Sequence, residues 1–149
     1  MQNSRIRLMM AEDIDAVHAI ECLSITPAWT KQGFADGLAN ENAAFFVAEH
    51  LESSKILGYC GLYFAADEGE ITNVAVHPEW RKQGIADQII DAVIEGAKQR
   101  GLGQIFLEVR ASNEPAKRLY EKHGFQPQGV RKNFYRDPKE DAIVMACFL

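Results

Sequence analysis

The chain has 149 residues, and 16 Lys and Arg against 21 Asp and Glu give it a formal net charge of −5 at pH 7. This length favours a single domain, 1–149, with a substantial core, and the acidic balance argues against a nucleic-acid-binding protein. The first residues lack the apolar core of a signal peptide and the longest apolar run, Ala43 to Ala48, is too short to cross a bilayer, so we expect a cytoplasmic protein with no membrane partner.

The first half of the chain predicts a strand, two helices and a hairpin. Polar and apolar residues alternate from Arg5 to Met10 as in a strand, and an apolar stripe then predicts a helix from Ala11 to about Leu23. The segments Phe45 to Glu49 and Ile56 to Phe64 read as two strands joined by a polar loop. Thr30 is a suitable N-cap for a short second helix between these parts. This helix should be weak, because Gly33 and Gly37 each cost about 1 kcal/mol relative to alanine.

Cysteine and histidine usage gives no sign of a metal site or a disulfide framework. Cys22, Cys60 and Cys147 are far apart and have apolar neighbours, so we expect all three to be core thiols of a reduced compartment. His18 lies in the stripe of the first helix and is interpreted as a packed or rim residue.

The centre of the sequence is a strand, a turn and a long helix. Ile71 to Val76 is apolar and β-branched, and Pro78 ends the strand because it has no N–H for a sheet ladder. Apolar residues then recur every three to four positions from Ile85 to Ala97, which predicts an amphipathic helix. Gly101 can take the left-handed conformation that ends it.

The turn between this strand and this helix is a basic, glycine-containing loop from Arg81 to Ala86. Free amides at a helix N-terminus bind phosphate, and cations beside them strengthen the binding. Read alone, the loop is either a phosphate site or an ordinary strand-to-helix turn. Its pattern, Arg-x-x-Gly-x-Ala, resembles the acetyl-CoA pyrophosphate loop of the GNAT superfamily of N-acetyltransferases.

The last third predicts a strand from Gln104 to Val109, a helix from Ser112 to His123, and strands from Gln128 to Arg136 and from Ala142 to Phe148. The whole order indicates a mixed α/β fold around one sheet. It is similar to the GNAT fold from end to end. That resemblance implies a mostly antiparallel central sheet, a parallel pair splayed at the acetyl-CoA site and about four helices.

A second motif covers Phe106 to Phe125 and resembles the other acetyltransferase signature. In that signature an acidic residue ends a strand, and a Ser-Asn turn starts a helix that carries Leu-Tyr-Glu and ends in Gly-Phe. The physical chemistry agrees with this layout, because Asn113 is a good N-cap and Pro115 suits the first helical turn. Gly124 suits the position after the helix.

Two residues of this motif are candidates for catalysis. Glu108 lies in an otherwise apolar strand, so it is either a satisfied ion pair, for example with Arg110, or a general base whose pKa is raised by its apolar setting. The resemblance implies the base. Tyr120 could be a packing residue, and the resemblance implies instead a phenol beside the thioester sulfur. His123, three residues further on, is not assigned a catalytic role.

The resemblance narrows to the RimI-like branch, which acetylates the N-terminal alanine of a ribosomal protein, on the segments 107–113, 131–135 and 140–145. Trp29 and Tyr135 then lie in the regions where the substrate peptide would bind. Relatives usually have Pro-Trp-Ser-Glu before the second helix, whereas this chain has Pro-Ala-Trp-Thr-Lys, so target identity stays open. Arg131, Lys132 and Arg136 either guide a substrate or coat an exposed strand.

The resulting hypothesis is direct transfer from acetyl-CoA to an amine, without a metal, in a monomeric enzyme. An α-amine of pKa about 8 is roughly a tenth neutral at pH 7, far more than lysine, so a protein N-terminus is the favoured acceptor. Small amines, lysine, and non-catalytic binding of acetyl-CoA or of a nucleotide are the alternatives. The residues expected to hold acetyl-CoA or its oxyanion are Val74, Ala75, Val76, Arg81, Lys82, Gln83, Gly84, Ile85, Ala86 and Asn113.

Overall fold

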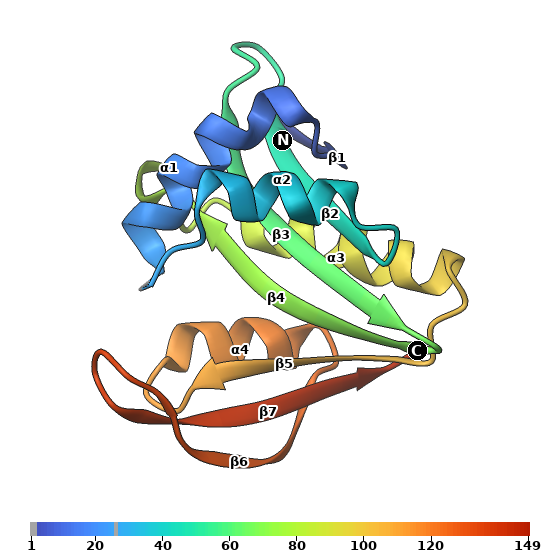
Figure 1. Ribbon diagram of the computed structural model, residues 1–149, viewed down its shortest axis with the longest axis vertical. Helices are drawn as coiled ribbons and strands as arrows, with labels where there is room; N and C mark the ends of the chain where they lie inside the picture. The colour runs from blue at the N-terminus through green and yellow to red at the C-terminus, as the bar shows by residue number, and fades with distance from the viewer. Residues whose placement is uncertain (1–2, 26) are drawn as a thin grey trace.

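A computed structural model describes residues 3–25 and 27–149 of the chain. One seven-stranded sheet has the strand order β1-β2-β3-β4-β5-β7-β6 (Figure 1). The strands are β1 (Ser4–Leu8), β2 (Ala43–His50), β3 (Ile56–Ala65), β4 (Glu68–Val76), β5 (Gln104–Arg110), β6 (Gln126–Tyr135) and β7 (Glu140–Phe148). The helices are α1 (Ile14–Ser24), α2 (Lys31–Ala39), α3 (Ile85–Gln99) and α4 (Glu114–Lys122), with 3-10 turns η1 (Ala11–Asp13) and η2 (Pro78–Trp80).

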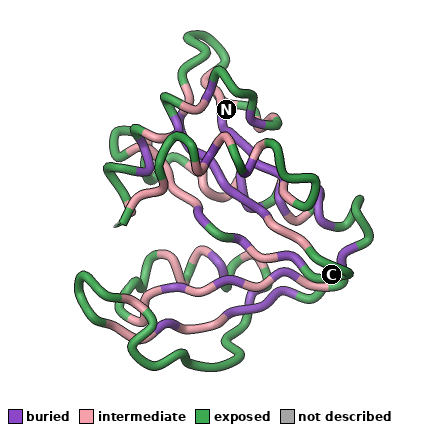
Figure 2. The backbone as a smooth tube through the Cα atoms, in the orientation of Figure 1, coloured by how far each residue is buried: buried purple, intermediate pink, exposed green. Residues whose placement is uncertain are grey.

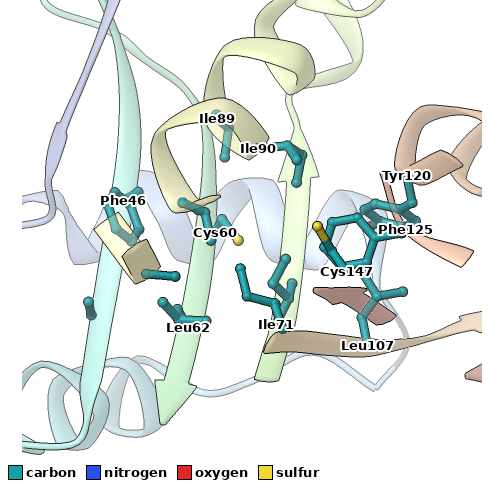
Figure 3. Close-up of a cluster of buried hydrophobic side chains, with 14 of the residues drawn as sticks. Phe46, Cys60, Leu62, Ile71, Ile89, Ile90, Leu107, Tyr120, Phe125 and Cys147 are labelled. Carbon is teal, nitrogen blue, oxygen red and sulfur yellow. The ribbon is translucent and has the colours of Figure 1, made fainter. Parts of the chain in front are cut away.

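Helices cover both faces of the sheet, and each face has its own core. Helices α1 and α2 lie in front of the first strands in Figure 1, and α3 lies behind them. Val17, Ile20 and Phe34 pack with alternate residues of β2 and β3 on the first face. Residues of α3 and α4 pack on the second face with the other alternate set, including Phe46, Cys60, Leu62, Ile89, Leu107 and Tyr120 (Figure 3). Figure 2 shows the buried stretches running along the central strands, whereas β6 is an exposed edge.

The sheet is antiparallel except for one short parallel pair in its middle. β4 pairs with β5 only through Glu68–Gln104, Gly69–Ile105 and Glu70–Phe106. Beyond that point the two strands diverge (Figure 1), while β4 stays paired with β3 and β5 with β7. The mixed α/β fold and the splayed parallel pair that we expected are therefore confirmed.

Local signals in the sequence account for the helix ends. The Thr30 hydroxyl accepts a hydrogen bond from the Gly33 amide at 3.0 Å, which caps α2. The Asn113 side chain caps α4 in the same way, accepting from the Ala116 amide at 3.2 Å. Gly101 and Gly124 end α3 and α4 with φ of +77° and +92°, the left-handed region that glycine enters without steric cost.

Two expectations need correction. Cys60 and Cys147 are buried, but Cys22 is exposed on α1, so the expectation of three core thiols is wrong for Cys22. β4 begins at Glu68, not at Ile71, because Glu68 and Gly69 pair with both neighbouring strands. Within the described part of the chain, no helix is long and apolar enough to span a membrane.

Candidate active site

Glu108 and a second carboxylate, Glu70, lie together where β4 and β5 separate. Glu70 pairs with Phe106 in the last rung of the parallel ladder, and Glu108 follows two residues later on β5. Cross-strand partners point to the same face, and so do residues two apart in a strand. Glu70 also pairs with Tyr63 of β3, which packs on the α1–α2 face. Both carboxylates therefore face the α1–α2 side of the sheet.

The two carboxyl groups interact directly. Burial raises the pKa of Glu70 above its ordinary value of 4.5, and the charge of Glu108 and a hydrogen bond between the two side chains raise it further. Arg131 opposes this shift. Sequence reasoning missed Glu70, because the central strand was expected to begin at Ile71, which left Glu70 outside it. An acidic residue directly before an apolar strand was the available signal.

The partner of Glu108 is Arg131 on the edge strand β6. The Arg131 Nε lies 3.3 Å from a Glu108 carboxylate oxygen, and the Glu108 side chain is only 11% exposed. Arg110, which we considered as the partner, instead lies 3.3 Å from Glu140. Arg131 therefore does more than coat the edge strand, since it reaches across the sheet to the candidate base.

Tyr120 approaches the same strands from the opposite face. It is buried on α4 in the cluster that includes Leu107 of β5, and its ring centroid lies 5.7 Å from that of Phe125 (Figure 3). Burial raises the pKa of Tyr120, with further contributions from Cys60 and Tyr135, so the phenol keeps its proton at neutral pH. Among the described residues, its hydroxyl has no hydrogen-bond partner, which leaves it available to a substrate.

The loop before α3 has the geometry of an anion site. Lys82 and Gly84 have φ of +62° and +81°, and a Cβ built on Gly84 would meet nothing within 4 Å. In the described part of the chain, no backbone carbonyl accepts a hydrogen bond from the amides of Lys82 to Ala86. These groups fit a pyrophosphate, which takes hydrogen bonds from several amides at once. Gln83 is exposed in the same loop, whereas Ile85 turns into the core.

Other expected donor-side residues have partners within the protein. The Arg81 Nε donates to the Val76 carbonyl at 3.3 Å, and its Nη2 lies 3.4 Å from the Ser24 hydroxyl. Arg81 thus ties the end of β4 to the end of α1. Val74, Ala75 and Val76 pair with β3 on one side only, since the β5 ladder ends at Glu70. Their strand edge toward β5 is the part that could meet an oxyanion.

The two expected acceptor-side residues border the carboxylate pair from different sides. Tyr135 lies at the end of β6 with the Arg110 guanidinium 4.3 Å above its ring. Burial raises the pKa of Tyr135, and the charge of Glu108 adds to the shift. Trp29 lies with Tyr63, the cross-strand neighbour of Glu70, at 6.1 Å between ring centroids. The rings of Trp29 and Tyr63 line a pocket of about 490 Å³, which Asp36 also lines.

Comparison with known proteins agrees with this geometry. The model of the acetyltransferase (GNAT) family matches residues 13–125. A Bacillus subtilis (strain 168) protein, provisionally named ribosomal protein bS18-alanine N-acetyltransferase, is 42% identical over 94% of this chain and 92% of its own length. The Escherichia coli (strain K12) ribosomal protein bS18-alanine N-acetyltransferase is 32% identical over 90% of each chain. A crystal structure of the Escherichia coli ribosomal-protein-S18-alanine N-acetyltransferase is similar with a TM-score of 0.88, covering 97% of this chain and 93% of that one.

Proposed function

Because this chain belongs to the acetyltransferase (GNAT) family, we propose that it transfers an acetyl group from acetyl-CoA to the N-terminal α-amine of a ribosomal protein that begins with Ala or Ser. The observation that carries this proposal is the register of β4 and β5. It brings Glu70 and Glu108 to one face at the point where the strands separate, while Tyr120 reaches the same strands from the other face. A base and an acid on opposite sides of one opening suit transfer between two substrates.

The donor side is built from backbone amides more than from side chains. Lys82 and Gly84 turn the loop so that its amides can bind the pyrophosphate of acetyl-CoA, with the Lys82 side chain as an exposed cation. Acetyl-CoA supplies a thioester, an acyl group activated toward amines. Asn113 caps α4 and thereby fixes the helix that carries Tyr120.

Glu108 acts as the base on the acceptor side. It takes a proton from the α-ammonium group, and the amine nitrogen then attacks the thioester carbonyl carbon with its free electron pair. Arg131 orients the Glu108 carboxylate toward the opening between the strands, since its Nε lies 3.3 Å from one carboxylate oxygen. Glu70 lies beside it and shares a hydrogen bond with it, so the ammonium group of an acceptor meets a pair of acidic side chains.

Tyr120 completes the transfer as the acid. Backbone amides between Val74 and Val76 stabilise the oxyanion that forms on the carbonyl oxygen. When the carbon–sulfur bond breaks, the Tyr120 hydroxyl gives its proton to the departing thiolate. The nitrogen releases its second proton to water as the amide forms, and water returns a proton to Tyr120. Its raised pKa suits this role, because the phenol is fully protonated at neutral pH.

The acceptor assignment rests on the relatives and on charge. The Escherichia coli relative is named as an alanine N-acetyltransferase of ribosomal protein bS18, and the Bacillus subtilis relative carries the same name provisionally. The face that presents Glu108 and Glu70 also borders a pocket with Asp36, so it suits the free ammonium group of a peptide. A ribosomal acceptor supports the proposal of a cytoplasmic enzyme, because ribosomes are assembled there.

The test is coenzyme A release from acetyl-CoA with a panel of acceptors: peptides beginning with Ala, Ser or Met, the same peptides with blocked N-termini, and spermidine. Activity should appear with free Ala-start or Ser-start peptides and be lost when the N-terminus is blocked. Glu108→Gln should reduce it more than about tenfold. Glu95→Gln, an exposed position on α3, is the matched control and should leave it unchanged. Turnover of spermidine alone would contradict the peptide assignment.

A further inference from the structure

Glu21 is a fully buried carboxylate in the last turns of α1, with 0% of its surface exposed. Asp13, another buried acid nearby, has Arg7 as its cation at 2.8 Å. Glu21 has no cation beside it among the described residues. Its carboxylate instead accepts hydrogen bonds from the Trp29 backbone amide at 2.9 Å, from the Asn73 side-chain amide at 3.4 Å and from the Tyr59 hydroxyl.

Burying Glu21 in this way lowers the stability of the fold, so its presence calls for an explanation. Removing a carboxylate from water without a cation is unfavourable, and only hydrogen bonds offset the loss here. All three partners are hydrogen-bond donors, so both oxygens of Glu21 have partners inside the fold. A well-packed apolar side chain would fill the same space at lower cost. The carboxylate is therefore best explained by the segments that it connects.

The segments that Glu21 connects are the loop around Trp29, called the acceptor loop below, and β4. Trp29 lines the pocket of about 490 Å³ next to Tyr63, and it directly precedes the N-cap of α2. Asn73 precedes Val74 on β4, beyond the last rung of the parallel ladder. The buried Glu21 side chain thus joins the acceptor loop to β4, the strand proposed to bind the thioester.

We propose that Glu21 is a positioning residue of acetyl transfer, which fixes the Trp29 loop against β4 so that the acceptor peptide is held in register with Glu108. The inference rests on the proposed function, because it deepens the account of the same site. Glu21 acts through Trp29 and Asn73 and touches neither substrate. Its loss should loosen the acceptor loop and leave the loop from Lys82 to Ala86, which binds the donor, as it is.

The test is a separation of the two Michaelis constants in Glu21→Gln. The amide cannot accept from all three donors, since its nitrogen is itself a donor. We expect KM for an Ala-start peptide to rise about tenfold, the effect of losing one hydrogen bond to a charged group, while KM for acetyl-CoA stays within about twofold. Asp13→Asn is the matched control, because it also removes a buried charge from the same region but lies outside the acceptor loop. It should lower stability and leave both constants unchanged.

An unchanged peptide KM in Glu21→Gln, or an equal rise in both constants, would overturn the inference. An equal rise in peptide KM in Asp13→Asn would also overturn it, because lower stability alone would then explain the rise in Glu21→Gln. If Glu21→Gln does not fold, hydrogen exchange of the Trp29 amide in the wild-type enzyme decides, since a bonded amide should be protected more than about a hundredfold. An unprotected Trp29 amide overturns the proposal. If the wild-type enzyme is inactive on every peptide, the proposed function itself is refuted. If the wild type is active but the two KM values do not separate in Glu21→Gln, only the role of Glu21 is refuted.

Discussion

Gly37→Ala should destabilise the protein, although alanine is the better helix former. A Cβ at this position would lie 2.7 Å from Phe45 Cε1 and 2.8 Å from the Tyr63 hydroxyl. Phe45 is only 2% exposed and packs against the rings of Trp29, Phe34 and Tyr63, so it has little room to move. Overpacking costs about 1–3 kcal/mol, against a gain of about 1 kcal/mol in helix propensity. We expect a net loss of about 1 kcal/mol.

Gly33→Ala, in the same helix, provides the control. Its Cβ would lie 3.5 Å from the Thr30 hydroxyl and 3.8 Å from Trp29, which are ordinary contacts. It should stabilise the protein by about 1 kcal/mol. Urea denaturation of both variants measures the difference, which should be about 2 kcal/mol at an unchanged slope. If Gly37→Ala stabilises the protein as much as Gly33→Ala does, the packing account of α2 is wrong.

Three further predictions concern the site. Gly84→Ala places an L-residue at φ +81°, which costs about 1–2 kcal/mol. Calorimetry should therefore show about tenfold weaker acetyl-CoA binding. Unchanged binding would contradict the proposal that this loop binds acetyl-CoA. Tyr120→Phe keeps the packing on Phe125 but removes the proposed acid, so steady-state kinetics should show kcat reduced about a hundredfold. An unaltered kcat would leave Tyr120 a packing residue only. Glu70 has a raised pKa, so the fold favours its protonated form, and wild-type stability falls as pH rises from 4.5 through that pKa. Glu70→Gln removes this loss, so urea denaturation should show the variant gaining stability relative to wild type over that window; a pH-independent difference would refute the coupling.

Much of the fold could be predicted because local chemistry fixes it. The alternation in β1, the stripe of α3 and the caps at Thr30 and Asn113 each depend on residues close in sequence. The loop from Arg81 to Ala86 and the segment around Glu108 could be found for the same reason, since each motif is contiguous.

What escaped sequence reasoning depends on pairing between distant strands. Glu70 becomes part of the site only through its register with Phe106. The contact between Arg131 and Glu108 crosses from β6 to β5, past β7, and nothing local distinguishes Arg131 from Arg110 as the partner. Cys22 was misplaced because a helix rotation of one residue separates the buried face from the exposed one.

The same limit applies to glycine and to buried charge. Gly37 reads as a weakness of α2, whereas the structure shows that the rings of Phe45 and Tyr63 occupy the space of a side chain. Glu21 falls beside Ile20 on the stripe of the first helix, and the sequence alone assigns it no role. Only the assembled fold brings Trp29, Asn73 and Tyr59 around its carboxylate.

The most direct test of the central claim is to locate the transferred acetyl group. An Ala-start peptide that also contains lysine is incubated with enzyme and acetyl-CoA, and fragmentation mass spectrometry then identifies the modified amine. The account predicts acetylation of the α-amine alone, at a rate reduced more than about tenfold in Glu108→Gln and unchanged in Glu95→Gln. Acetyl groups on lysine, or a Glu108→Gln variant as fast as wild type, would contradict it.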